Sequence, residues 1–370
     1  MEPIFPSKKY LRLFAGCLPV RGARRTAIVD TQRQKHYFVP NGLHELLGSG
    51  HYLDLAAVLT AYEPPQQAII RQYVDFLLHH ELAFLTDEPE RFPNIDLTFR
   101  TPEPITNAII DVDAASGFDF AGLAGQLSAL KCKALQLRFS DAWPCPAVQQ
   151  VLAAFADSTL RHIDVFAPYD ASFEPGALAE LSRTAPRLNV LHLYGAPADR
   201  VTWYRKFDLR VVQVQQVLRF PGCCGTVQPE YFTYNLTHVA EATAHNSCLH
   251  RKIAVDARGN IKNCPSMSQA YGNVRHDSLA AALQQPGFTA LWNTAKDQVR
   301  GCQDCEFRLI CTDCRAYTED PDDTLSKPLK CGYDPYTARW EDWSRNPLKQ
   351  AAQAYYGLPM PEPELLAAPA

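Results

Sequence analysis

Residues 302–314 read CQDCEFRLICTDC, and this stretch decides how the C-terminal third of the chain is interpreted. It contains two C-x2-C pairs, and this is the tightest spacing that lets two thiolates face one metal centre. Cys331 stands alone downstream, and Cys248 and Cys264 flank the upstream segment 252–262. That segment reads KIAVDARGNIK, which predicts a hairpin whose turn brings the two flanking thiols together.

Seven cysteines in this region are more than one metal ion needs. A tetrahedral zinc site uses four ligands, whereas seven thiolates suit two iron–sulfur clusters. Zinc remains the alternative metal. The candidate ligands are Cys248, Cys264, Cys302, Cys305, Cys311, Cys314 and Cys331. The other five cysteines are interpreted as small buried residues, with redox or metal contact left open for the adjacent pair: Cys17, Cys132, Cys145, Cys223 and Cys224.

Composition and charge favour a cytoplasmic metalloprotein. The chain has 370 residues, of which 46% are hydrophobic and 21% charged, and its net charge of −4 does not point to nucleic acid. It has no apolar run of about 18 residues, so no membrane contact is expected. Residues 1–6 lack the layout of a signal peptide, and in a reducing compartment cysteines bind metals more often than they form disulfides.

Residues 1–98 predict a domain similar to a winged helix. Segments 25–30 and 35–39 alternate like the strands of a hairpin, and a closing strand is expected at 82–85. Between them, apolar residues recur with helical spacing. Lys and Arg outnumber acids up to residue 40, which predicts either a solvated face or a groove for an acidic peptide. DNA binding is the rival interpretation, but no helix here is rich in Arg or Lys.

Residues 99–230 predict a partial (β/α) barrel. After a Pro-rich linker, short apolar runs alternate with helix-like stretches, which is typical of a parallel sheet with right-handed crossovers. Apolar runs of this kind predict strands buried on both faces. The strand candidates are 105–112, 134–139, 163–166, 190–193 and 211–214, and the helix candidates are 123–130, 147–156 and 176–183. Residues 231–345 form the cysteine-rich domain, and residues 346–370 are interpreted as a helix with a loose tail.

The cysteine spacing resembles the SPASM domain. The pattern is C-x15-C with Gly259 before the second cysteine, then C-x2-C-x5-C-x2-C, then a single cysteine. Stretches 13–25, 38–43, 261–267 and 302–308 are similar to one subfamily, the SPASM-domain peptide maturases of the grasp-with-spasm systems. The resemblance implies an α/β multi-domain chain with a degenerate radical SAM barrel and a C-terminal domain that holds two four-iron four-sulfur clusters.

The resemblance also implies a partition of the ligands. The second cluster takes Cys302, Cys305, Cys311 and Cys331. The first takes Cys248, Cys264 and Cys314, with His245 or His250 as a further ligand or with one site open to water or a peptide side chain. The family spacing before the penultimate cysteine is three residues, and here it is two.

The function that the resemblance implies is maturation of a ribosomally made, graspetide-like precursor peptide beside an ATP-grasp ligase. A radical SAM enzyme needs a C-x3-C-x2-C loop after its first barrel strand, and residues 113–120 read DAASGFDF. S-adenosylmethionine cleavage is therefore not expected, and Asp111 and Asp113 are interpreted as a solvated strand end. No P-loop, H-E-x2-H or G-x-S-x-G motif is present, so enzymatic activity of the chain itself stays open. The alternatives are an active radical SAM-type enzyme with an unrecognised initiating cluster and a zinc-stapled peptide-binding module.

Overall fold

The computed structural model describes residues 9–220 and 222–358. The chain divides into two compact units, and each draws on separate segments of the sequence. Residues 1–99, 227–247 and 294–370 make up what we call the terminal unit, and residues 100–226 and 248–293 make up the sheet unit. Lys8 and the Pro- and Ala-rich tail from residue 359 lie outside the described residues.

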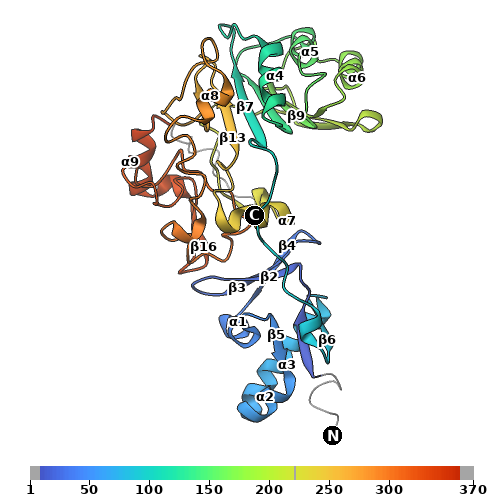
Figure 1. Cartoon of the computed structure of the whole chain (residues 1–370), viewed down its shortest axis with the longest axis vertical. Coiled ribbons are helices and arrows are strands. Elements are labelled where there is room, and N and C mark those ends of the chain that lie inside the picture. The colour runs from blue at the N-terminus through green and yellow to red at the C-terminus, as the bar shows by residue number, and fades with distance from the viewer. Residues whose placement is uncertain (1–8, 221, 359–370) are drawn as a thin grey trace. The chain divides into compact units, whose positions relative to one another are not determined.

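The sheet unit is built on a mixed sheet of eight strands that is mostly parallel. Its order is β11-β12-β10-β9-β8-β7-β13-β14. The parallel strands are β7 (Asn107–Val112), β8 (Ala134–Phe139), β9 (His162–Pro168), β10 (Leu188–Tyr194), β12 (Leu209–Val214) and β13 (Lys252–Val255). The antiparallel edges are β11 (Arg200–Tyr204) and β14 (Ile261–Lys262). All five predicted strands are present, and the predicted hairpin forms as β13–β14, with β13 paired to β7 (Figure 1).

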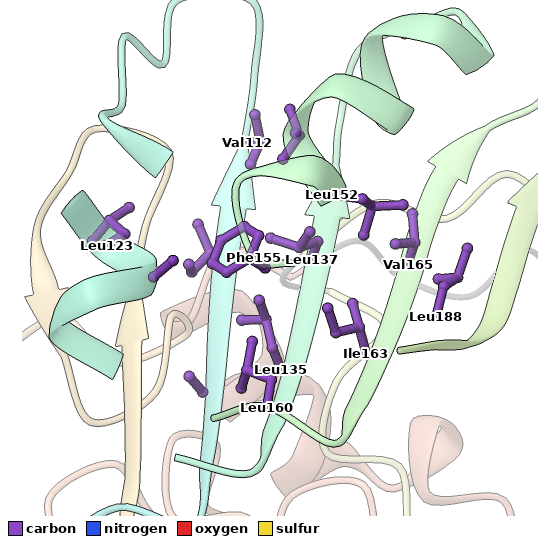
Figure 2. Packing of buried hydrophobic residues seen from close by; sticks show 14 of the residues in the cluster. Val112, Leu123, Leu135, Leu137, Leu152, Phe155, Leu160, Ile163, Val165 and Leu188 are labelled. Atoms are coloured by element: carbon purple, nitrogen blue, oxygen red, sulfur yellow. The ribbon is translucent and has the colours of Figure 1, made fainter. Parts of the chain in front are cut away.

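Helices cover one face of this sheet. The crossovers contain α4 (Phe120–Ala129), α5 (Cys145–Ala153) and α6 (Pro175–Thr184), and a short α8 (Leu279–Leu283) follows the hairpin. Figure 2 shows strand residues such as Leu137 and Val165 packed against Leu152 and Phe155 in the core between sheet and helices. Burial of this apolar layer is the main force that holds the unit together.

The other face of the sheet is only half-buried, which corrects the expectation of strands buried on both sides. In β7, Ala108, Ile110 and Val112 are buried, while Asn107 and Asp111 between them are not. This alternation has the period of two that a strand with one covered face requires. The short runs in the sequence concealed the pattern because Ile109 also lies on the half-exposed face.

The N-terminal part of the terminal unit contains two small antiparallel sheets and three helices. One sheet has the order β5-β1-β6 and the other β2-β3-β4. The strands are β1 (Tyr10–Leu13), β2 (Cys17–Arg21), β3 (Thr26–Asp30), β4 (Lys35–Val39), β5 (Tyr52–Asp54) and β6 (Ala83–Thr86), and the helices are α1 (Asn41–Leu47), α2 (Leu55–Ala61) and α3 (Pro64–His79). The predicted hairpin is β3–β4, whose turn is closed by Asp30 Oδ1, which accepts the backbone N–H groups of Gln32 and Arg33.

The rest of the terminal unit has little regular structure. Its elements are α7 (Leu236–Ala244), β15 (Tyr333–Asp334), β16 (Arg339–Trp340) and α9 (Pro347–Tyr355). Among the described residues of both units, the single 3-10 turns are η1 (Pro89–Arg91), η2 (Arg205–Phe207), η3 (Pro229–Tyr231), η4 (Lys296–Gln298) and η5 (Trp343–Arg345). Within the described residues, no helix is long and apolar enough to cross a membrane.

Candidate metal centres

Four of the predicted ligands line one cavity in the terminal unit. Cys302, Cys305, Cys311 and Cys331 all border it, and they are the set assigned to the second cluster. The cavity between the thiols is narrow, with a volume of about 20 Å³, and a much larger open groove of about 790 Å³ lies beside it. Gly301, Lys327 and Pro335 line both spaces, so the thiols lie next to a surface large enough for a peptide segment.

Tight turns within the motif bring three of these thiols together. The N–H of Cys305 donates to the carbonyl of Cys302, and the N–H of Cys311 donates to that of Phe307, both at 3.0 Å. The fourth thiol belongs to Cys331, whose backbone forms an isolated parallel β-bridge with Val227. The motif therefore forms the loop locally, and a distant segment completes it.

Cations surround this group of thiols. Lys296 is 4% exposed, and its Nζ donates to Cys311 Sγ and to the carbonyl of Thr312, both at 3.0 Å. Arg308 and Lys327 also line the cavity. Burial opposes the charge on Lys296, but the adjacent Cys311 and Asp313 raise its pKa. A buried ammonium is stable only where negative charge is also present. Asp313 provides such a charge, and thiolates bound to a metal would add to it.

Burial favours the protonated form of three of these thiols. Burial raises the pKa of Cys302 to about 12, and it also raises the pKa values of Cys305 and Cys311. Metal coordination deprotonates a thiol outright, so binding here releases protons and brings negative charge to Lys296.

The four cavity thiols do not form a site for a single metal ion. In the part of the chain that the structure describes, no three His, Cys, Asp or Glu side chains are positioned to hold one metal ion. The four thiols of the cavity therefore face a common space without converging on one point. A four-iron cluster binds each thiolate at a separate iron, so it would not need the four thiols to meet at one point.

The turn between β2 and β3, which forms a hairpin, supports the loop of residues 302–314 within the terminal unit. Glu306, between Cys305 and Phe307, is fully buried, and Arg25 Nε donates to its Oε1 at 2.7 Å. The hydroxyl of Tyr333 donates to the same oxygen. At Gly22 an added Cβ would lie 2.8 Å from Glu306 Oε2 and 2.9 Å from its backbone nitrogen, so the hairpin and the loop are in direct contact.

The basic N-terminal segment is largely occupied by contacts of this structural kind. Arg12 is 2% exposed and donates to Asn94 Oδ1 at 2.8 Å. Arg33 pairs with Asp30 at 3.1 Å, and Arg25 pairs with Glu306. These three cations stabilise the unit, which leaves fewer charges for the groove that was one interpretation of the sequence.

The sheet unit contains a second group of cysteines. Lys252 Nζ donates to Cys248 Sγ at 3.4 Å. The register of β13–β14 pairs Ala254 with Lys262, and its continuation places Cys264 opposite Lys252. The predicted approach of the two hairpin thiols therefore has a cation between them that the sequence pattern did not indicate.

Cys224 belongs to the same surroundings. Arg138 NH1 donates to Cys224 Sγ at 3.1 Å, while its Nε and NH2 donate to Asp111 at 2.5 and 2.8 Å. A hydrogen bond with the Cys223 thiol and the charge of Arg138 lower the pKa of Cys224. Asp111 is thus part of an ion pair rather than a solvated strand end, and burial raises its pKa despite Arg138.

The remaining predicted ligands are Cys314, His245 and His250. Cys314 belongs to the terminal unit, where it packs with Tyr317, Leu329 and Ala352. In the same unit the ring of His245 lies 6.0 Å from Phe99, and in the sheet unit that of His250 lies 5.6 Å from Trp292. Cys17, Cys132 and Cys145 are buried, as the sequence predicted, but the prediction was wrong for Cys223, which is exposed, and Cys224 is only partly buried.

The segment after β7, where the sequence resemblance would place a cysteine triad, is a polar turn. After β7, Asp113 Oδ1 accepts the N–H of Ala115 and the hydroxyl of Ser116. The carbonyl oxygen of Ala257 also lies 2.7 Å from the Ser116 hydroxyl oxygen and is an alternative acceptor for its proton. Residues 113–120 contain no cysteine. This turn offers no thiolate with which to hold an initiating cluster.

Comparisons with known proteins give little information about this chain. No protein-family model matches it, and no curated protein sequence matches it. Among solved structures it is similar to SuiB of Streptococcus suis, with 10% sequence identity and a TM-score of 0.27. That alignment covers 84% of this chain and 95% of SuiB, and a likeness of this strength does not define the fold.

Proposed function

We propose that this protein is a cytoplasmic SPASM-type iron–sulfur protein that assists the maturation of a ribosomally made peptide. It would bind the precursor and act beside an ATP-grasp ligase, which carries out the bond-forming chemistry. The observation that carries the proposal is the cavity lined by Cys302, Cys305, Cys311 and Cys331 with the ammonium of Lys296 beside it.

The donor set of this cavity fits an iron–sulfur cluster better than other cofactors. Its donors are thiols, and four-iron clusters are held by four cysteine thiolates. Cations that contact the sulfurs offset the negative charge of a thiolate-bound cluster and raise its reduction potential. Lys296 and Phe307, whose N–H donates to Cys305 Sγ at 3.4 Å, are the residues that would provide such contacts.

Peptide recognition is assigned to the N-terminal part of the terminal unit. Its helices and small sheets support the winged-helix interpretation. β4 is an edge strand of β2-β3-β4, which leaves one side open for pairing with an extended peptide. A groove between α1 and α3 contains Ile69 and Tyr62, two apolar side chains that are more than one-third exposed. Edge pairing gives affinity and such a groove gives side-chain selection.

The absence of a cysteine triad supports an accessory role. The turn after β7 offers hydroxyl and carboxylate groups but no thiolates, so the chain has no identified means of cleaving S-adenosylmethionine. Incubation of the reconstituted protein with S-adenosylmethionine and dithionite is expected to give no 5′-deoxyadenosine. Its formation would show that the protein is a radical enzyme in its own right.

The proposed function is tested by coexpression. The precursor and the ligase are produced together with the wild-type protein, with Cys311→Ala, or alone, and the modified peptide is measured by mass spectrometry. Wild type is expected to raise the yield of linked peptide, and Cys311→Ala to lose that effect because a cluster ligand is gone. An equal product mass and yield in all three cultures would show that this function is wrong.

A further inference from the structure

The loop that follows β12 brings a cysteine to the polar face of the sheet. Phe220 in this loop lies 5.8 Å from Phe166 on β9 and 6.3 Å from Tyr194 on β10, measured between ring centroids. The guanidinium of Arg138, on β8, lies 4.5 Å from the centroid of Phe220. These contacts direct the chain across the half-exposed face to Cys224, which follows four residues later.

Arg138 holds Cys224 in one position. Arg138 is 2% exposed, and two of its guanidinium nitrogens donate to the carboxylate of Asp111. This bidentate pairing fixes the orientation of the planar guanidinium group. The remaining terminal nitrogen, NH1, donates to Cys224 Sγ at 3.1 Å. A cysteine whose only role was to fill space would not need a charged donor from the neighbouring strand.

The hairpin cysteines share a second cation with Cys224. Lys252 Nζ donates to Cys248, and Cys264 lies opposite Lys252 across the hairpin. The charge of Lys252 acts on the thiols of Cys224 and Cys264 as well, and those two thiols also act on each other. Three sulfurs from two separate segments of the sheet unit are therefore gathered around one ammonium.

We propose that Cys224 is a thiolate ligand of an iron–sulfur cluster that it shares with Cys248 and Cys264, because these thiols are not positioned to hold a single ion and a cluster binds its thiolates at separate irons. The proposal rests on the iron–sulfur function proposed above for the kind of metal bound. It adds a ligand that the cysteine spacing did not indicate, and it gives the sheet unit three thiols of its own. Arg138 and Lys252 then serve as positioning residues that donate to the ligating sulfurs.

The test compares four full-length proteins purified without oxygen: wild type, Cys224→Ala, Cys132→Ala and Cys302→Ala. Cys132 is a matched control because it is a fully buried cysteine of the sheet unit whose thiol donates to the carbonyl of Ala134. Iron, sulfide and zinc are measured per chain, and the dithionite-reduced proteins are examined by electron paramagnetic resonance.

The wild type and Cys132→Ala are expected to hold about eight irons each. Cys224→Ala should lose about four of them, or keep them with a changed resonance from one cluster. Cys302→Ala should lose the other cluster, so that its spectrum and that of Cys224→Ala together account for the wild-type signal. Circular dichroism confirms that each variant is folded.

The outcomes separate this inference from the proposed function. Wild type with two clusters and Cys224→Ala with the same iron content and spectrum would overturn the inference alone. Zinc in place of iron would overturn the iron–sulfur function, and loss of zinc from Cys224→Ala but not from Cys132→Ala would still establish Cys224 as a ligand. A wild-type protein that binds neither metal would overturn both.

Discussion

The two groups of cysteines present the same kind of side chain but are built in different ways. In the terminal unit, three of the four cavity thiols come from one short motif whose own turns bring them together. In the sheet unit, Cys224 and the hairpin cysteines come from separate segments and are held by Arg138 and Lys252 on strands. A motif can therefore be recognised from spacing alone, whereas a centre assembled by packing cannot.

The difference extends to how each group depends on the fold around it. The loop of Cys302–Cys311 lies in a region with little regular structure, so few backbone ladders hold it when metal is lost. The sheet-unit thiols lie on a sheet that its apolar core stabilises independently. The predictions below test this contrast, beginning with the largest expected effect.

Removal of metal is expected to unfold part of the terminal unit while the sheet unit stays folded. Where a metal organises a loop, its binding free energy is folding free energy, on the order of 10 kcal/mol for structural sites. Limited proteolysis of metal-depleted protein, read by mass spectrometry, should give cleavage within residues 294–345 before any cleavage within 105–214. Simultaneous cleavage of both regions would contradict the contrast between the units.

Asp111→Ala is expected to lower the free energy of unfolding of the sheet unit by about 3–5 kcal/mol. The substitution leaves the guanidinium of Arg138 buried without its carboxylate partner. The loss of unfolding free energy is measured by unfolding in urea, with hydrogen exchange of the β7 and β8 amides as the readout. The double variant Asp111→Ala/Arg138→Met removes the charge as well and should recover part of the stability, and no recovery would assign the loss to packing.

Gly22→Ala is expected to destabilise the terminal unit by about 1–3 kcal/mol. The new Cβ would meet the backbone nitrogen of Glu306 and the carbonyl of Arg25, both at 2.9 Å, and neither can move freely. Gly42→Ala is the matched control, because nothing lies within 4 Å of an added Cβ there. Thermal unfolding of the two variants should differ, and equal melting temperatures would show that the hairpin does not press on the cysteine loop.

Mild acid is expected to weaken the terminal unit more than the sheet unit. Burial lowers the pKa values of His36, His44, His51 and His238 in the former and of His192 in the latter. A histidine with a lowered folded pKa binds fewer protons when folded, so stability decreases as the pH falls through about 6.5, the unfolded value. Hydrogen exchange at pH 7.5 and 5.5 should show a larger loss of protection in the terminal unit than in the sheet unit, and equal losses would contradict this prediction.

Local pattern was sufficient for much of the sheet unit. The prediction for 134–139 coincides with β8, and the hairpin at 252–262 forms as expected. The pattern did not predict that β13 joins the sheet beside β7, because parallel pairing depends on residues far apart in sequence. Asp111 could not be paired with Arg138 for the same reason, since their register is a property of two strands and the crossover between them.

The cysteine motif of residues 302–314 was by itself enough to predict a loop that gathers several thiols, because C-x2-C spacing places two thiols on one side of a single turn. Alternating strands and helices were likewise enough to predict the parallel sheet. Tertiary structure alone decided that Lys296 lies beside Cys311, and that Arg138 and Lys252 bring Cys224 and the hairpin thiols together. The physical reason is that the sequence does not reveal which Lys or Arg will be buried beside a cysteine. Only folding removes that side chain from water and places a sulfur within hydrogen-bond distance of it.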